Sequence, residues 1–195
     1  MAQTERLHGL MRDVAEAGCL SDGHFEFRSG LRALHLLDRD RLLCDTHLAR
    51  RLGYALSRQF FLSRIDVVAA PSVWGAGLAQ WVGYFLDPHR PVVYPIQADG
   101  KQDFSTAAAE QLDGKRVLIV DNLILSGKTV QDFAQLITAH GGTPIGVGTL
   151  ADLSGRAFPI TITGLLNPYL GIFDPADAAS IPPEVANLPV ERVGY

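Results

Sequence analysis

The chain has 195 residues, which is enough for one globular domain or for one domain with a small appendage. Hydrophobic residues make up 47% of it and charged residues 19%, a balance that supplies a sizeable core and excludes an extended disordered chain. The formal net charge of -4 gives no global basic field for the phosphates of nucleic acids or for an anionic membrane surface. Any anionic ligand must therefore be held locally.

Cysteine content and the N-terminal sequence favour a cytoplasmic protein. Cys19 and Cys44 are the only cysteines, and residues 1–18 contain no apolar run of the length that a signal peptide needs. We therefore expect two reduced thiols rather than a disulfide. Residues 67–86 carry no formal charge, but a proline, a serine and two glycines interrupt their middle. This pattern predicts a buried strand, a turn and a helix rather than a membrane span.

The N-terminal residues predict a helix followed by a hairpin. Residues 4–17 carry apolar side chains at helical spacing and stop at Gly18, a typical C-terminal signal. Residues 25–28 and 34–37 alternate weakly around a Ser-Gly turn, which indicates a short hairpin.

A helix capped by Asp45 and ending near Leu62 opens an alternation of strands and helices. The expected strands are 65–70, 91–95, 116–120 and 145–150, and the next expected helices are 76–86 and 130–140. Near-continuous runs of valine, isoleucine and alanine are typical of strands buried on both faces, which predicts a mainly parallel sheet covered by helices. After Pro159 the chain becomes irregular and rich in proline, so we expect a surface tail rather than a second domain.

The most informative segment is RVLIVDNLILSGKTV, residues 116–130. It predicts a buried strand that brings Asp121 and Asn122 to its carboxyl end, where open α/β sheets place their ligands. The small-residue turn that follows runs into a helix N-terminus, whose N–H groups form a ready site for one phosphate group. Ser126 and Thr129 add hydroxyl donors, and the Asp121 carboxylate is suited to accept hydrogen bonds from sugar hydroxyls. Together these features predict a site for a sugar 5-phosphate.

Two other interpretations of this segment stay open. Ser126 to Thr129 is similar to the end of a nucleoside triphosphate P-loop, but that motif needs a glycine five residues before Gly127, where Asn122 stands. Few residues follow Thr129, which leaves little room for the other parts of such an enzyme. The second alternative is an ordinary strand, turn and helix in which Asp121 is a capping residue.

VLIVDNLILSGKT resembles the phosphoribosyl pyrophosphate (PRPP) motif of type I phosphoribosyltransferases, in which acidic residues after a strand precede a turn rich in threonine and glycine. The orotate branch of that family is similar over nearly the whole chain. FEFRSGLRALHLLD resembles its opening segment, AAPSVWGAGLA resembles its pyrophosphate loop, and GVGTLADLSG with residues 173–194 resembles its closing part.

The resemblance implies an α/β fold with a central parallel sheet of about five strands flanked by helices. It implies one domain over residues 1–195, in which residues 1–40 contribute to a small N-terminal hood and 165–195 form the surface tail, and usually a homodimer. The ligand would be PRPP or a nucleoside 5′-monophosphate. As a pentosyltransferase of this family, the protein would exchange a nucleobase for pyrophosphate at the ribose C1, with Mg²⁺ carried by PRPP and not held directly by protein ligands.

The resemblance also assigns roles to individual residues. Phosphate and ribose binding fall to Asp121, Asn122, Leu125, Ser126, Gly127, Lys128 and Thr129. The pyrophosphate loop is Ser72, Val73, Trp74 and Gly75, and the base pocket includes Arg28, His35, Leu36 and Leu153. Asp121 and Lys101 are the candidate catalytic residues.

Four features depart from the family pattern. Asn122 stands where the family has a second acid, Trp74 replaces a pyrophosphate-loop lysine, and Leu153 replaces the arginine that grips the carboxylate of orotate. Residues 96–104 hold one basic residue, Lys101, where the family brings several cations to the leaving pyrophosphate. Removing one such donor typically costs ~2.7–4 kcal/mol of transition-state stabilisation. Two alternatives therefore stay open: a nucleotide-sensing or partner-binding homologue that has lost transfer chemistry, and a transferase for a neutral or hydrophobic base.

Overall fold

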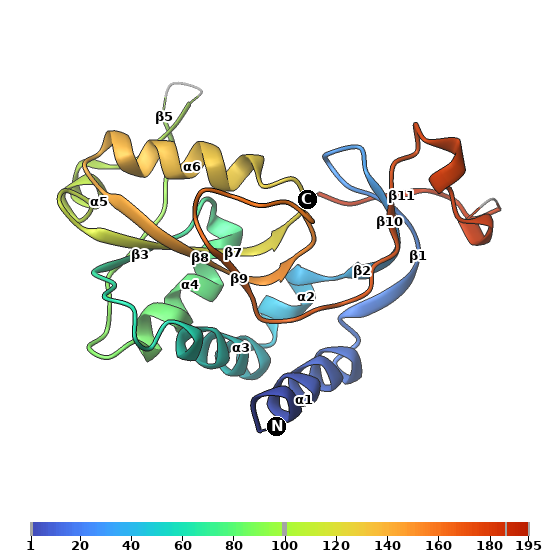
Figure 1. Ribbon diagram of the computed structural model, residues 1–195, viewed down its shortest axis with the longest axis horizontal. Helices are drawn as coiled ribbons and strands as arrows, with labels where there is room; N and C mark the ends of the chain where they lie inside the picture. The colour runs from blue at the N-terminus through green and yellow to red at the C-terminus, as the bar shows by residue number, and fades with distance from the viewer. Residues whose placement is uncertain (1, 99–100, 186, 195) are drawn as a thin grey trace. The chain divides into compact units, whose positions relative to one another are not determined.

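The computed structural model describes residues 2–98, 101–185 and 187–194 (Figure 1). The chain folds into two compact units: Leu43–Asn167 form the larger unit, and Met1–Leu42 together with Pro168–Tyr195 form the smaller one. The larger unit carries the predicted parallel sheet and segment 116–130, and the smaller unit carries the predicted hairpin.

The larger unit is built on a five-stranded sheet with the order β4-β3-β7-β8-β9, in which every strand pair is parallel. The strands are β3 (Val67–Ala69), β4 (Val92–Val93), β7 (Arg116–Ile124), β8 (Thr143–Asp152) and β9 (Ile162–Gly164). Val117 to Val120 of β7 are fully buried, as expected for a central strand covered on both faces. The fold class predicted from the sequence is confirmed.

Helices cover both faces of this sheet (Figure 1). α3 (Thr46–Gln59) and α4 (Val73–Phe85) lie on one face, and α5 (Thr106–Glu110) and α6 (Lys128–Ala139) lie on the other. Because side chains alternate along a strand, Val117 and Ile119 of β7 pack with Phe133 and Ile137 of α6. Burial contributes roughly 1.5–3 kcal/mol for each side chain of this size, so it fixes α6 on β7.

Asp45 caps α3, as the sequence predicts. Its carboxylate accepts hydrogen bonds from the N–H groups of His47 and Leu48, both at 3.0 Å. Such a cap stabilises a helix by about 1 kcal/mol. The helix ends at Gln59, before the expected end, because the next N–H bonds to the carbonyl of Ser57 and tightens the last turn.

The glycine-rich turn expected after β3 is helical. α4 begins at Val73 and not at Ala76, so Val73, Trp74 and Gly75 form its first turn. Ser72 is the N-cap residue, and its hydroxyl oxygen accepts a hydrogen bond from the Gly75 N–H at 3.4 Å. The glycines suggested a loop, but the serine cap determines where the helix begins.

β7 and β8 are longer than predicted. β7 continues to Ile124 and β8 to Asp152, since the two strands stay paired through Asp121 with Thr149 and Ile124 with Asp152. Asp121 and Asn122 therefore lie within a strand instead of at the end of one, and successive side chains of a strand point to opposite faces of the sheet.

Three further strands of the larger unit lie in stretches that the sequence left irregular. Ile162–Gly164, after Pro159, form β9 at the edge of the sheet beside β8. β5 (Ile96–Ala98) and β6 (Lys101–Asp103) form an antiparallel hairpin. These strands are short and depend on their partners, which explains why local propensity did not reveal them.

The smaller unit contains a four-stranded sheet with the order β10-β2-β1-β11. Its elements are α1 (Ala2–Glu16), β1 (Leu20–Glu26), β2 (Arg32–Leu37), β10 (Ile172–Phe173), η1 (Ala178–Ser180), η2 (Pro183–Val185) and β11 (Glu191–Arg192), and α2 (Arg39–Cys44) follows β2. β1 and β2 form the predicted antiparallel hairpin. The tail, expected to be irregular, supplies β10 beside β2 and β11 beside β1.

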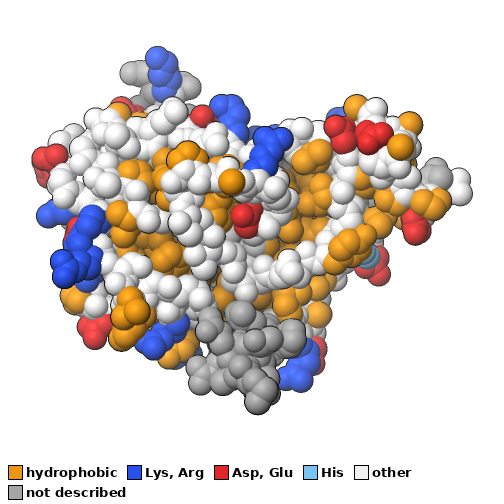
Figure 2. Space-filling view, in the orientation of Figure 1, with side chains coloured by type: hydrophobic (Ala, Val, Ile, Leu, Met, Phe, Trp, Pro, Cys, Tyr) orange, Lys and Arg blue, Asp and Glu red, His pale blue; other side chains and the backbone are white. Residues whose placement is uncertain are grey.

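The charged side chains of one face, the two cysteines and the helix lengths complete the description of the surface and the fold. Lys and Arg side chains are scattered over the face shown in Figure 2, where the described residues form no continuous basic patch. Cys19 is buried and Cys44 is exposed, so the two cysteines lie in different surroundings. In the part of the chain that the structure describes, no helix combines the length and the apolar character needed to cross a bilayer.

An ion pair joins the start of β7 to the residue before β3. The Arg116 guanidinium donates to both carboxylate oxygens of Asp66 at 2.9 Å, and the Arg116 backbone N–H donates at 3.0 Å. These hydrogen bonds hold the pKa of Asp66 well below its usual range. Because the folded-state pKa is depressed, the stabilisation is present above the unfolded pKa of about 3.9 and is lost as the pH falls through the folded-state pKa.

We therefore expect Asp66→Asn to lower the melting temperature at neutral pH, with a penalty that shrinks progressively below about pH 4. Thermal unfolding followed by circular dichroism across this range measures the effect. The exposed pair of Lys128 with Asp132 offers a control, since Asp132→Asn should change the melting temperature little at any pH. A penalty for Asp66→Asn that is the same at every pH would contradict the ionic origin of the effect.

Candidate active site

Asp121 lies on the central strand β7, in its carboxyl-terminal half and close to the first turn of α4. Its side chain is half-buried, and its Oδ1 accepts a hydrogen bond from the Asn122 N–H at 2.8 Å. A β-carbon placed on Gly75 would lie 3.4 Å from Asp121 Oδ1 and 3.1 Å from the carbonyl oxygen of Val120. The structure thus brings together the predicted ribose carboxylate and the predicted pyrophosphate segment.

Leu125 to Gly127 form the turn between β7 and α6, and Lys128 and Thr129 begin the helix. Gly127 is the N-cap residue, and its φ of 75° is a left-handed conformation that favours glycine. Because glycine has no side chain, Gly127 provides no side-chain cap for α6. Ser126 Oγ accepts a hydrogen bond from the Lys128 N–H, but this bond is long, at 3.4 Å. The backbone N–H groups and the positive end of the helix dipole are thus arranged for an anion.

The Lys128 side chain extends along α6. Its Nζ donates to Asp132 Oδ2 at 2.7 Å, one helical turn further along, and both side chains are exposed. A P-loop lysine must reach the phosphates, so this geometry disfavours the P-loop interpretation. The backbone N–H groups and the hydroxyls of Ser126 and Thr129 are left as the donors for a phosphate group.

Asn122 is fully buried. Its Nδ2 donates to the backbone carbonyl of Trp74 at 2.9 Å, and its own backbone carbonyl accepts from Thr149 Oγ1 at 2.9 Å. Asn122 Oδ1 has no hydrogen-bond partner among the described residues. The side chain therefore ties β7 to the first turn of α4, and its predicted contact with ribose stays a prediction.

The β5–β6 hairpin makes one contact beside the start of α4 and another at the end of α6 that lies away from the turn. Gln102 Nε2 donates to the carbonyl of Pro71 at 3.4 Å, directly before the cap of α4. Asp103 accepts a hydrogen bond from His140 Nε2 at 2.7 Å, at the C-terminal end of α6, and this bond is the main cause that lowers the pKa of Asp103. Lys101 is exposed on the same hairpin, one residue before Gln102. The predicted catalytic cation thus lies on an element that contacts the pyrophosphate segment.

The predicted base-pocket residues are divided between the two units. In the larger unit, Leu153 follows β8 and its N–H donates to the last carbonyl of β7 at 2.8 Å. In the smaller unit, Arg28 is exposed in the hairpin turn and Leu36 is buried. His35 Nδ1 bonds to the Asp22 carboxylate at 2.8 Å across β1 and β2. Their common role in binding a base stays a prediction.

Within the described residues, no group of three His, Cys, Asp or Glu side chains could hold a metal ion. Mg²⁺ commonly binds one or two carboxylates together with phosphate oxygens and water. A single carboxylate, Asp121, beside an anion site therefore fits a Mg²⁺ ion that arrives with a diphosphate ligand.

Sequence reasoning missed three residues that shape this region: Gln102, His140 and Phe158. Gln102 and His140 tie the hairpin to its neighbours, and a β-carbon on Gly127 would overlap the Phe158 ring. The position of His140 directly before two glycines, at a helix end, was a weak signal. For Phe158 no local signal exists, because its contact with the turn is tertiary.

A strand-borne carboxylate beside a turn that runs into a helix N-terminus, on a parallel sheet, is the arrangement expected of a phosphoribosyl-binding site. The sequence profile of the phosphoribosyl transferase domain matches residues 47–163, more than half of the chain. The chain belongs to the phosphoribosyltransferase family.

Its curated relatives include the orotate phosphoribosyltransferase of Thermus thermophilus, 30% identical over 152 residues that cover 76% of this chain and 81% of that protein. The orotate phosphoribosyltransferase of Caulobacter vibrioides is 27% identical over 190 residues, covering 95% and 94% of the two chains.

Solved structures show the same fold. The orotate phosphoribosyltransferase of Aeropyrum pernix superposes with a TM-score of 0.65 at 19% identity, covering 80% of this chain and 92% of that chain. The orotate phosphoribosyltransferase of Mycobacterium tuberculosis in complex with inorganic phosphate superposes with a TM-score of 0.61 at 19% identity, covering 85% and 96%. The resemblance read from the sequence is confirmed at the level of family and fold.

Proposed function

We propose that this protein transfers the 5-phosphoribosyl group of PRPP to a nucleobase, with orotate as the first candidate base. The proposal is carried by one observation: Asp121 on β7 is followed by the turn Leu125–Gly127 and the N-terminus of α6, in a chain of the phosphoribosyltransferase family. The names of its curated relatives support orotate and favour transfer over a non-catalytic role.

Each part of the site has a task in this reaction. The N–H groups at the turn and the start of α6 hold the 5-phosphate, and Asp121 accepts hydrogen bonds from the ribose hydroxyls. The bond between C1 and the pyrophosphate oxygen breaks, a bond from C1 to a base nitrogen forms, and the base loses a proton. The Asp121 carboxylate stabilises the positive charge that develops on the ribose in the transition state.

The leaving pyrophosphate needs positive charge. Mg²⁺ bound with PRPP would neutralise part of the charge on that group, and Asp121 is the carboxylate best placed to contribute to holding it. Lys101, on the hairpin whose Gln102 contacts Pro71, is the protein cation available from residues 96–104. The N–H groups of the first turn of α4 supply further donors on the same side of the site.

The identity of the base depends on the segment after β8. Leu153 stands where the family has an arginine, and Arg156, which is exposed, follows three positions later. Orotate, uracil and adenine therefore form the first test panel, because they differ in carboxylate charge and in ring. The base that releases pyrophosphate from PRPP names the reaction.

We also propose a homodimer, as the family resemblance implies, and a cytoplasmic location, which the low cysteine content supports. Sedimentation equilibrium of the purified protein measures the oligomeric state. A mass of one chain at micromolar concentration would contradict the dimer.

Asp121→Asn is expected to lower kcat for pyrophosphate release by roughly 100-fold or more, because the neutral amide no longer stabilises the positive charge on the ribose. The KM for PRPP should change less than kcat, since the phosphate donors are intact. The measurement uses the purified full-length protein with PRPP, Mg²⁺ and the active base of the panel. Glu110→Gln, which removes an exposed carboxylate from the end of α5, is the matched control and should leave both constants unchanged. An Asp121→Asn variant as active as the wild type would overturn the assignment.

A further inference from the structure

The Phe158 side chain contacts the turn that the proposed function assigns to phosphate. A β-carbon placed on Gly127 would overlap the Phe158 ring, so the ring lies directly against the glycine backbone. Gly127 is buried and has a φ of 75°. Its carbonyl accepts a hydrogen bond from the Gln131 N–H at 3.0 Å, but the glycine has no side chain, so beyond this bond the groups that pack against it restrict its conformation.

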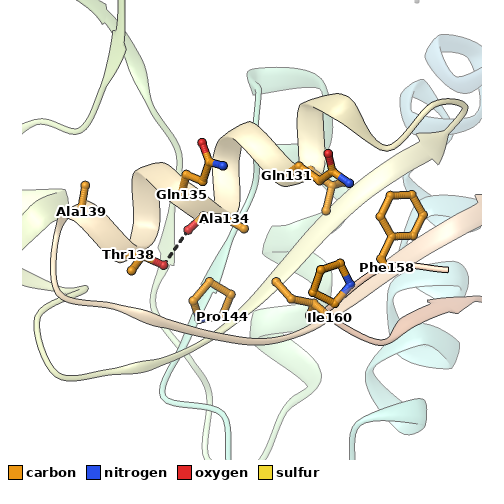
Figure 3. Close-up of a pocket in the computed structure, with 10 residues that line it drawn as sticks. Gln131, Ala134, Gln135, Thr138, Ala139, Pro144, Phe158 and Ile160 are labelled. Atoms are coloured by element: carbon orange, nitrogen blue, oxygen red, sulfur yellow. Dashed lines mark hydrogen bonds between the residues drawn. The ribbon is translucent and has the colours of Figure 1, made fainter.

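The ring is held on one side and open on the other. Phe158 is half-buried and packs against the core cluster that contains Val130 and Phe133 of α6. Its other side borders a hollow of about 630 Å³ between α6 and the segment around Ile160, and Figure 3 shows the ring at the N-terminal end of α6. The position of the Phe158 ring is therefore set by its contacts with the core and with Gly127. The side of the ring that borders the hollow does not help to set this position.

The segment that carries Phe158 meets the turn at two points. At its start, the Leu153 N–H donates to the carbonyl of Ile124 at 2.8 Å, and the Asp152 carboxylate accepts from the N–H and the hydroxyl of Ser154 at 3.1 and 2.6 Å. At its end, the Phe158 ring covers Gly127. Segment 153–158 therefore contacts the chain at Ile124, directly before the turn 125–127, and at Gly127, the last residue of the turn.

We propose that Phe158 is a positioning residue that holds the turn 125–127 in its phosphate-binding conformation. This inference rests on the proposed function of the turn. The ring does not touch the phosphate: it restricts Gly127, whose neighbours supply the N–H donors. Without the ring, the turn samples other backbone conformations, and PRPP must order it on binding at a cost in affinity.

Phe158→Ala should weaken PRPP binding by about tenfold or more, which corresponds to about 1.4 kcal/mol. The KM for PRPP should rise by a similar factor, while kcat at saturating PRPP should stay within about twofold, because ordering is complete once the ligand is bound. Phe158→Leu, which keeps a large apolar side chain over Gly127, should recover most of the affinity. Isothermal titration with PRPP and Mg²⁺ gives the affinity, and steady-state pyrophosphate release gives the split between KM and kcat.

Ile160→Ala is the matched control. Ile160 packs against the same core cluster and borders the same hollow, but it makes no contact with Gly127 that the structure records. It should lower the melting temperature without changing the affinity for PRPP. Hydrogen exchange of the Gly127 amide adds a second readout, and it should become faster in Phe158→Ala and not in Ile160→Ala.

The outcomes separate this inference from the proposed function. If the wild type binds PRPP and both alanine variants bind it equally well, Phe158 has no positioning role. If both variants lose affinity in proportion to their loss of stability, the effect belongs to the core and the inference is wrong. If the wild type itself does not bind PRPP, the proposed function fails first. Should Phe158→Ala fold poorly, Phe158→Val and Ile160→Val replace the two alanine variants, because valine takes the ring off Gly127 at a smaller cost in packing; only Phe158→Val should then lose PRPP affinity.

Discussion

Replacing Gly127 with alanine is expected to weaken PRPP binding by about 100-fold or more and to lower the free energy of unfolding by about 2–5 kcal/mol. The φ of 75° costs a residue with a side chain about 1–2 kcal/mol. The added β-carbon would also overlap the Phe158 ring, and such overpacking costs about 1–3 kcal/mol. A shift of the turn relieves both the backbone strain and the overlap with the ring. The same shift moves the N–H donors out of the phosphate-binding arrangement.

Urea unfolding and calorimetric titration with PRPP measure the two effects. Gly114→Ala is the matched control, because Gly114 has a φ of 67° and no atom close to an added β-carbon. In Gly114→Ala the free energy of unfolding should fall only by the cost of the left-handed backbone conformation, about 1–2 kcal/mol, and the PRPP affinity should not change. The double variant Gly127→Ala with Phe158→Ala removes the overlap, so its loss of stability should be smaller than the sum of the two single losses, while the affinity should not recover. Full PRPP affinity in Gly127→Ala would show that the turn is not the phosphate site.

Gly127 also illustrates which parts of the site were accessible to sequence reasoning. The turn and the start of α6 were predicted because their signals are local: a strand of apolar residues, small residues, then a helical pattern. The burial of Asn122 was not predicted, since it depends on a hydrogen bond to Trp74, which lies 48 residues earlier in the chain. The contact of Phe158 with Gly127 joins the segments that follow two different strands, β8 and β7, so neither local sequence predicts it.

The same distinction applies to the fold. Runs such as Val117 to Val120 identify buried strands, because continuous apolar residues are needed where helices cover both faces. The extension of β7 to Ile124 was missed, because two polar residues interrupt the apolar run while the ladder with β8 continues. β9, β10 and β11 have two or three residues each, so their strand conformation comes from β8, β2 and β1 and not from their own sequence.

Asn122 gives the second large effect. Because the family has an acid at this position, Asn122→Asp looks like a restoration, but the structure predicts the opposite. The side chain is fully buried, and its Nδ2 donates to the Trp74 carbonyl at 2.9 Å. An aspartate would place an oxygen there, leaving the carbonyl without its donor and a charge without a partner, at a cost of about 1–3 kcal/mol or more. kcat/KM should fall by about tenfold or more, since the first turn of α4 is no longer tied to β7.

The pH dependence of stability identifies the cause. Burial and the facing carbonyl raise the pKa of the new carboxyl in the folded state, so the folded protein binds more protons than the unfolded chain. The destabilisation should therefore be smallest below the unfolded pKa of about 3.9 and should grow as the pH rises through neutrality towards the folded-state pKa. Asn122→Leu, which is neutral and of similar size, should show a loss that is independent of pH. Urea unfolding of the wild type and both variants at about pH 4 and about pH 8 makes the comparison. If Asn122→Asp were as stable at high pH as at low pH, or more active than the wild type, its carboxylate would be reaching solvent or ligand, and Asn122 would be a binding residue and not a structural tie.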